Sequence, residues 1–154
     1  MRTPDQGRWD FVQQWLDRAH RDLRVAAILL RDDVQDYENA GFHAQQAAEK
    51  FLKAFLVRYQ IEFPKTHNIA QLRQLIEQRE PALAERLAPA DALTPYGVEF
   101  RYPGALPPLS LDQGVQALQL AEQTRDLILA YLQPYLSAGR PAGEGPVEGK
   151  GQHP

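Results

Sequence analysis

The chain has 154 residues and a formal net charge of −3, from 17 Lys and Arg against 20 Asp and Glu. This length suits one domain with a buried core, and the charge argues against broad attraction to nucleic acid or an anionic membrane, while leaving room for a local basic pocket. The absence of cysteine excludes disulfides and thiolate metal sites, and no apolar run is long enough for a membrane span or a secretory signal, so we expect a cytoplasmic protein.

The first half of the chain predicts two long helices. Residues 1–8 are polar, and we expect them to form an unstructured lead-in. Over residues 9–31, apolar side chains recur at steps of three and four, which is the period of an amphipathic helix. A second helix is predicted over residues 37–59, and the alanines along its centre would let another helix approach closely. The central positions of this helix are Ala40, Ala44, Ala48, Phe51 and Phe55.

Two shorter helices are predicted in the middle of the chain. After a connection over residues 61–64, Thr66 or Asn68 can cap a third helix. The buried stripe of this helix consists of Ile69, Leu72, Leu75 and Ile76. Pro81 can open a fourth helix over residues 82–87, because proline is tolerated in a first helical turn.

The last third of the chain completes an all-α domain. Prolines and glycines predict a mostly irregular segment over residues 89–108, and Ser110 can cap a fifth helix that continues to about Leu132. Residues 137–154 contain five glycines and three prolines and are expected to be disordered. No segment alternates with the period of a strand. We therefore expect an antiparallel up-and-down bundle of four to five helices over residues 9–136, followed by a disordered Gly/Pro-rich tail.

One face of the second predicted helix carries a polar stripe. His43, Gln46 and Lys50 lie at i, i+3 and i+7, and Lys53 is beside them. One interpretation is a phosphate or nucleotide contacted by the two lysines, with His43 as hydrogen-bond donor or proton carrier. The alternative is a solvated border of the helix, on which Glu49 and Lys53 form an ordinary i, i+4 ion pair.

Two other segments can also carry chemistry. Residues 65–67, Lys-Thr-His, place a cation and His67 near a helix N-terminus, where backbone N–H groups favour an anion; alternatively, Thr66 caps the helix and His67 bonds to backbone. Arg101 can bind a phosphate with Tyr102 stacked on a base; alternatively, Arg101 ties a loop to a helix end and Tyr102 packs in the core.

Other kinds of site have no sequence support. No spacing of histidines and carboxylates predicts a metal site. Neither a nucleophile motif nor a glycine-rich phosphate or dinucleotide loop is present. We therefore predict no metal and no cofactor.

Taken together, the polar segments and the helical pattern resemble the HEPN domain family (higher eukaryotes and prokaryotes nucleotide-binding) over about residues 10–136. The matching residues are Ala19, Asp22, Leu23, Ala26, Leu29 and Leu30; Phe42, His43, Gln46, Ala47, Ala48, Glu49, Lys50, Lys53 and Ala54; Lys65, Thr66 and His67; Leu93, Thr94, Tyr96, Arg101, Tyr102, Pro103 and Gly104; and Ala117, Ala121 and Leu132.

The resemblance implies a helical bundle that usually dimerises, with a polar groove between protomers. Many small prokaryotic members look like partners of a minimal nucleotidyltransferase, commonly in a toxin–antitoxin pairing. The chain is thus expected to be a homodimeric nucleotide- or substrate-binding module with such a partner, in contact with a nucleotide or RNA phosphate. The expected lining of its pocket is His43, Gln46, Lys50, Lys53, His67, Arg101 and Tyr102.

The resemblance also implies a rival function. Other members of the family are metal-independent ribonucleases that carry an arginine, four to six residues, and then a histidine. No histidine follows Arg101 at that spacing, so a ribonuclease here would need His43 or His67 from elsewhere in the fold. A structural dimer without a ligand is a third possibility. The sequence leaves open whether the three polar segments converge in space.

Overall fold

The protein is all-helical in the part of the chain that the computed structural model describes, residues 1–97 and 107–143. Its elements are α1 (Pro4–Leu29), α2 (Tyr37–Arg58), α3 (Ile69–Glu77), α4 (Pro81–Leu87), the 3₁₀-helix η1 (Ala88–Gly97) and α5 (Leu111–Ala138). These elements confirm the predicted all-α helical bundle. None of the described helices is long and apolar enough to cross a membrane.

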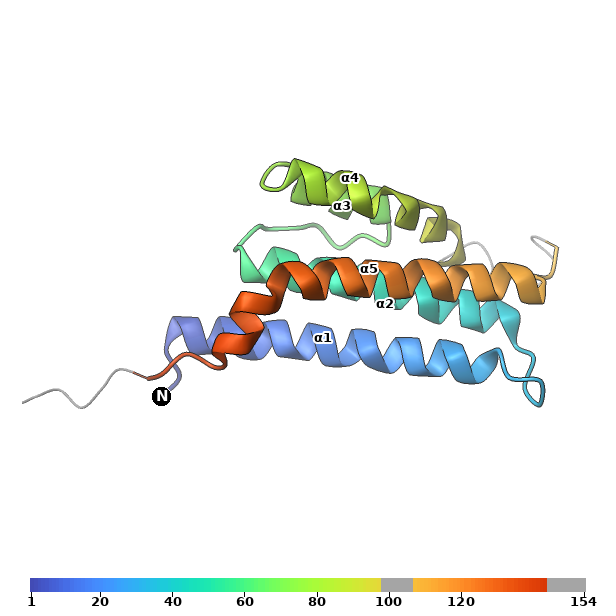
Figure 1. Cartoon of the computed structure of the whole chain (residues 1–154), viewed down its shortest axis with the longest axis horizontal. Helices are drawn as coiled ribbons and strands as arrows, with labels where there is room; N and C mark the ends of the chain where they lie inside the picture. Colours follow the sequence, from blue (N-terminus) through green and yellow to red (C-terminus); the bar gives the residue numbers. More distant parts are fainter. Residues whose placement is uncertain (98–106, 144–154) are drawn as a thin grey trace, which may run out of the picture.

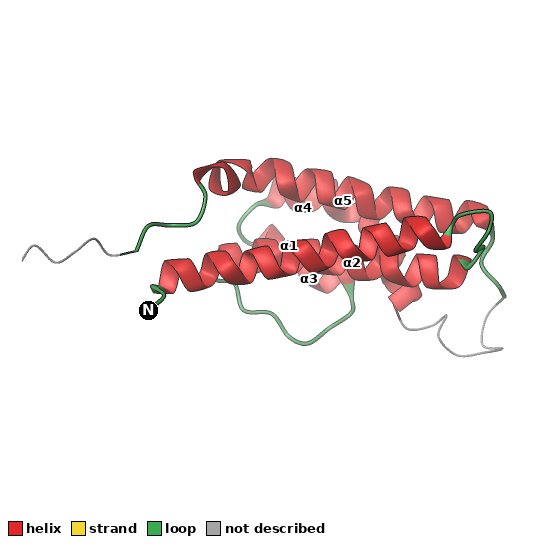
Figure 2. Ribbon diagram, turned by 90° about the horizontal axis from the view of Figure 1, so that it is seen from below, coloured by secondary structure: helices red, strands yellow, loops and turns green. Residues whose placement is uncertain are grey.

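The long helices form the body of the bundle, with α2 at its centre. Figure 1 shows that α2 and α5 both run opposite to α1. The shorter helices α3 and α4 cover the side of α2 and α5 that faces away from α1 (Figure 1). The connection over residues 59–68 returns along α2 before α3 begins, and it bulges from the body of the molecule in Figure 2. This return places the connection beside the polar face of α2.

The core is built around the central helix. The side chains of Ala44, Ala47 and Ala48 are fully buried, as the predicted close approach of a neighbouring helix requires. Further along α2, Phe51 and Phe55 are also fully buried. The core contacts of α2 are therefore made by small side chains over residues 44–48 and by aromatic rings at Phe51 and Phe55.

The structure differs from the prediction at the start of the chain and in residues 89–97. The lead-in is not unstructured, because α1 already begins at Pro4. The side chain of Thr3 accepts the N–H of Gln6, and the side chain of Gln6 accepts the N–H of Thr3, which is a complete capping box. In the first part of the segment 89–108, which was predicted to be mostly irregular, η1 extends to Gly97, while residues 98–106 lie outside the described residues. The fixed φ of proline suits the dihedral angles of a 3₁₀-helix, so Pro89 and Pro95 are accommodated in it.

The last helix is longer than the expected end at Leu132. It continues through Pro134 to Ala138, and Figure 1 shows that its last part bends toward α1, as a proline inside a helix explains. Beyond it, Arg140 forms a salt bridge with Asp10 of α1 at 3.0 Å. The rest of the predicted tail, from residue 144, lies outside the described residues. The domain limits 9–136 stay a prediction.

Protonation of His20 is expected to destabilise the bundle. Its ring packs edge-on against Phe51, with centroids 5.1 Å apart, and burial lowers the pKa of the imidazole from 6.5, helped by the positive charge of Arg125. The stability that neutral His20 provides is therefore present above pH 6.5 and lost as the pH falls through the lowered pKa. We expect the native protein to lose stability faster than His20→Gln between about pH 7 and pH 5. Urea unfolding at both pH values measures this, and parallel losses would contradict it.

Candidate functional site

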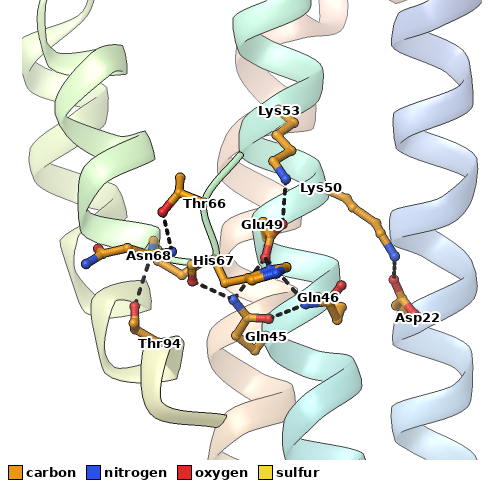
Figure 3. Close-up of polar contacts among 11 residues, drawn as sticks. Asp22, Gln45, Gln46, Glu49, Lys50, Lys53, Thr66, His67, Asn68 and Thr94 are labelled. Carbon is orange, nitrogen blue, oxygen red and sulfur yellow. Dashed lines mark hydrogen bonds and ion pairs between the residues drawn. The ribbon is translucent and has the colours of Figure 1, made fainter. Parts of the chain in front are cut away.

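The polar face of α2 lies between α1 and the connection over residues 59–68. We call the group of interacting side chains on this face the polar seam, and Figure 3 labels its members apart from His43. It consists of Asp22 from α1; His43, Gln45, Gln46, Glu49, Lys50 and Lys53 from α2; and His67 from the connection. Two of the three predicted polar segments thus converge. Arg101 and Tyr102, the third, lie outside the described residues.

One half of the polar seam is organised by Asp22. One carboxylate oxygen lies 2.9 Å from Nδ1 of His43, and the other accepts a hydrogen bond from the ammonium group of Lys50. Asp22 is buried on α1, directly before Leu23 of the core. Asp22 therefore links α1 to α2 through the imidazole ring of His43 and the ammonium group of Lys50.

The other half of the polar seam is organised by Glu49, whose side chain is only 3% exposed. Its oxygen atoms lie 2.5 Å from Nζ of Lys53 and 3.1 Å from Nδ1 of His67. The amide groups of Gln45 and Gln46 donate to the same carboxylate at 3.1 and 3.4 Å. The i, i+4 pair of Glu49 and Lys53 thus exists, but it is buried and not on a solvated border.

The connection is fixed at His67 by its backbone as well as its ring. The amide of Gln45 donates to the carbonyl oxygen of His67 at 2.9 Å. The side chain of Gln45 packs tightly against Gly97, the last residue of η1. A Cβ atom added to Gly97 would lie 2.8 Å from Cδ of Gln45. Three elements therefore meet at Gln45, namely α2, the connection and the end of η1.

The N-terminus of α3 is satisfied by neighbouring side chains. Asn68 caps the helix by accepting the N–H of Gln71 at 3.0 Å, and the hydroxyl of Thr94 accepts the N–H of Ile69 at 3.1 Å. Of the two predicted caps, Asn68 is correct, while Thr66 instead accepts the N–H of Asn68. These bonds favour the structural interpretation of this helix entrance over an anion site on its backbone.

The two lysines of the polar seam have different environments. Lys53 is 10% exposed, and its ammonium lies 5.3 Å from the centroid of the Trp15 ring and 5.8 Å from that of Phe63. Together with Glu49, these rings enclose the charge by ion pairing and cation–π contact. Lys50 is more open but is bonded to Asp22. The positive charge of each lysine is thus balanced within the chain.

The two histidines are arranged for chemistry at their outer ring nitrogens. Each places Nδ1 against a carboxylate, so Nε2 is the ring atom left for a ligand. The side chain of His67 is 61% exposed and that of His43 is 28% exposed. A ring held in this way can donate to an anion when protonated or accept a proton when neutral.

The sequence pattern did not predict three residues of the polar seam as part of a site, namely Asp22, Gln45 and Glu49. Their positions within the apolar stripes of α1 and α2 could have indicated them. Gln45 and Glu49 continue, at steps of three and four, into the buried positions Leu52 and Leu56. Similarly, Asp22 interrupts the buried stripe of α1. A polar residue inside an apolar helical stripe predicts a buried, hydrogen-bonded group.

A cavity of about 480 Å³ lies elsewhere, between α4 and α5. It is lined by Glu80, Ala82, Leu83, Arg86, Asp126, Leu127, Ala130 and Tyr131. None of these residues belongs to the polar seam. Among the described residues, no group of three or more histidines and carboxylates could hold a metal ion.

Comparisons with known proteins agree with this fold. The family described as HEPN domain matches residues 12–131. A crystal structure of TT1696 from Thermus thermophilus is similar, with a TM-score of 0.63 and 30% sequence identity, over 77% of this chain and 96% of that chain. No curated protein gives a significant match.

Proposed function

Because the chain belongs to the HEPN domain family, we propose that it is a nucleotide- or substrate-binding module that forms a homodimer and pairs with a minimal nucleotidyltransferase. Its setting would be a toxin–antitoxin-like two-component system. The family supports this proposal, since many of its small prokaryotic members resemble such partners. The proposed ligand carries a phosphate, as a nucleotide or RNA does.

The observation that carries the proposal is the pair of carboxylate-held histidines in the polar seam. His43 and His67 each have Nδ1 bound to a buried or mostly buried carboxylate and Nε2 directed away from it. Hydrogen bonds between a protonated imidazole and a phosphate oxygen are charge-assisted and therefore strong. Gln46 lies three residues after His43 on α2, and its amide donates to Gln45 at 2.7 Å and to Glu49 at 3.4 Å.

Native mass spectrometry of the protein, isolated from its own cells at natural abundance, tests the assembly. We expect a mass of two copies of this chain together with a second polypeptide. A dimer alone would remove the nucleotidyltransferase partner from the proposal, and a monomer would remove both assembly claims.

The substitution His67→Gln is expected to weaken binding of AMP by about tenfold or more, which corresponds to the loss of one charge-assisted hydrogen bond. Glutamine can still accept a bond from neighbouring groups but carries no charge. Calorimetric titration measures the affinity, and His20→Gln is the matched control because His20 lies outside the polar seam. Equal affinities of His67→Gln and the native protein would contradict the site assignment.

A second candidate function is a metal-independent ribonuclease. The carboxylate-held imidazole favours it, because a carboxylate at Nδ1 orients the ring so that Nε2 can take a proton from an RNA 2′-OH. Arg101 would then steady the scissile phosphate. RNA cleavage with a bell-shaped pH profile that is lost in His67→Ala and in Arg101→Ala would support this function, whereas an absence of cleavage would remove it.

A further inference from the structure

The cavity between α4 and α5 has the size and the lining of a small-molecule site. Its volume of about 480 Å³ falls within the range of about 300–1,000 Å³ that ligand sites occupy. Leu83 is buried and Leu127 is half-buried, so these two side chains give the cavity an apolar floor. Ala82 and Ala130 are exposed at its rim, and their small side chains leave the cavity open to solvent.

One end of the cavity is closed by a hydrogen-bonded pair of side chains. The hydroxyl of Tyr131 donates to the carboxylate of Glu80. Burial raises the pKa of the Tyr131 phenol, and the bond to Glu80 raises it further, so the hydroxyl stays a neutral donor. The ring centroid of Tyr131 lies 5.3 Å from that of Phe55 and 6.0 Å from that of Tyr59. This end is therefore a fixed wall in which the carboxylate already has a donor.

The opposite end of the cavity contains a cation without a partner. Arg86 on α4 and Asp126 on α5 lie more than one helical turn from Glu80 and Tyr131, respectively. Asp126 accepts a hydrogen bond from Arg125 at 2.9 Å. None of the ion pairs among the described residues involves Arg86. The guanidinium group of Arg86 is thus the charge in this cavity that is left for a ligand.

The hollow surface continues past Arg86. A second hollow of about 380 Å³ shares Arg86, Asp126 and Leu127 with the cavity and adds Gln123, one turn earlier on α5. Arg86 lies where the two hollows meet, with the apolar floor on one side and polar side chains on the other. An anionic group bound to Arg86 would therefore have its apolar part in the larger cavity.

We propose that this cavity binds a small amphipathic carboxylate, with the carboxylate on the guanidinium of Arg86 and the apolar chain on Leu83 and Leu127. The planar guanidinium can donate two parallel hydrogen bonds to a carboxylate. Transfer of the apolar chain from water to the leucine side chains adds a favourable contribution. The cavity is separate from the polar seam, so this inference goes beyond the proposed function.

The acidic side chains of the cavity favour a ligand with one negative charge. Glu80 and Asp126 each have a donor within the chain, namely Tyr131 and Arg125, and so do not require a cationic ligand. They repel a phosphate monoester, which carries nearly two negative charges, more strongly than a carboxylate. The charges of the cavity therefore suit a carboxylate better than a phosphate.

Sodium octanoate is the probe that tests the site. Its binding is followed by two-dimensional NMR of the full chain at pH 7 and constant ionic strength. We expect the shifts to concentrate at the residues of α4 and α5 that line the cavity. Octylammonium has the same chain with the opposite charge and should bind about tenfold more weakly or less, because it cannot accept the hydrogen bonds of Arg86. Tighter binding of octylammonium than of octanoate would overturn the assignment.

Two variants with matched controls locate the ligand. Arg86→Gln removes the cation and should weaken octanoate binding about tenfold, while Arg21→Gln, at an exposed position of α1, should not change it. Ala130→Trp fills the cavity from an exposed position and should abolish binding, while Ala27→Trp, also exposed but on α1, should leave it intact. Thermal unfolding verifies each bundle, and the arginine variant decides the question if the tryptophan variant does not fold.

The outcomes are distinct from those for the polar seam. The absence of shifts along α4 and α5, or octanoate binding that is unchanged in Arg86→Gln and Ala130→Trp, would overturn the site. Conversion of a dimer to a monomer by Ala130→Trp, measured by native mass spectrometry, would assign the cavity to the interface with a second copy and would also overturn it. AMP binding at the polar seam involves other residues, so either proposal can fail while the other holds.

Discussion

Replacement of Glu49 by alanine is expected to lower the free energy of unfolding by about 3–5 kcal/mol, the range found when one partner of a buried ion pair is removed. Glu49 is 3% exposed and accepts bonds from Lys53, His67 and Gln45. Its removal leaves the buried ammonium group of Lys53 without its acceptor and removes one of the two acceptors of the Gln45 amide. Urea denaturation followed by circular dichroism measures the loss.

Two comparisons make this result specific to the buried pair. Glu85→Ala changes an exposed glutamate on α4 and should alter stability by no more than about 0.5 kcal/mol. The double variant Glu49→Leu with Lys53→Met replaces both charges by apolar groups and should recover much of the loss. A cost for Glu49→Ala as small as that for Glu85→Ala would mean that water reaches the pair.

The substitution Phe55→Ala is expected to cost about 3–5 kcal/mol, as large-to-small changes in a protein core do. Phe55 of α2 is fully buried, and its ring centroid lies 4.7 Å from that of Tyr59 and 5.3 Å from that of Tyr131 on α5. Alanine would leave a cavity and remove this aromatic contact between α2 and α5. Urea denaturation gives the cost, and hydrogen exchange should show lower protection in the second half of α5.

Phe11→Ala is the matched control, since it makes the same substitution on the exposed side of α1. The ring of Phe11 contacts only that of Trp15 among the described aromatic rings, at 5.8 Å. Its loss should therefore cost much less than that of Phe55. If both variants lost the same stability, the packing around Phe55 would not be the cause.

Helix periodicity predicted most of the fold because the apolar stripes are local. Residues 37–59 were predicted as one helix, and α2 spans Tyr37–Arg58. The start of α1 at Pro4 was missed because its first turn is stabilised by a capping box and not by an apolar stripe. The helical part of the segment 89–108 was missed because its prolines were interpreted as breakers, although a 3₁₀-helix accepts them.

The polar seam could be predicted only in part. The stripe of His43, Gln46 and Lys50 follows from helical spacing, and its proximity to His67 does not. The pairs that organise it, Asp22 with His43 and Glu49 with His67, join residues 21 and 18 positions apart. Such pairs depend on how the elements pack, and the local sequence pattern holds no record of that packing.

The contact between Gly97 and Gln45 has a consequence for the evolution of the chain. Only a hydrogen atom fits at position 97 while the Gln45 side chain holds His67 in place. A larger residue at position 97 should therefore be tolerated only where position 45 has a shorter side chain. We expect these two positions to change together among homologues, even though 52 positions separate them.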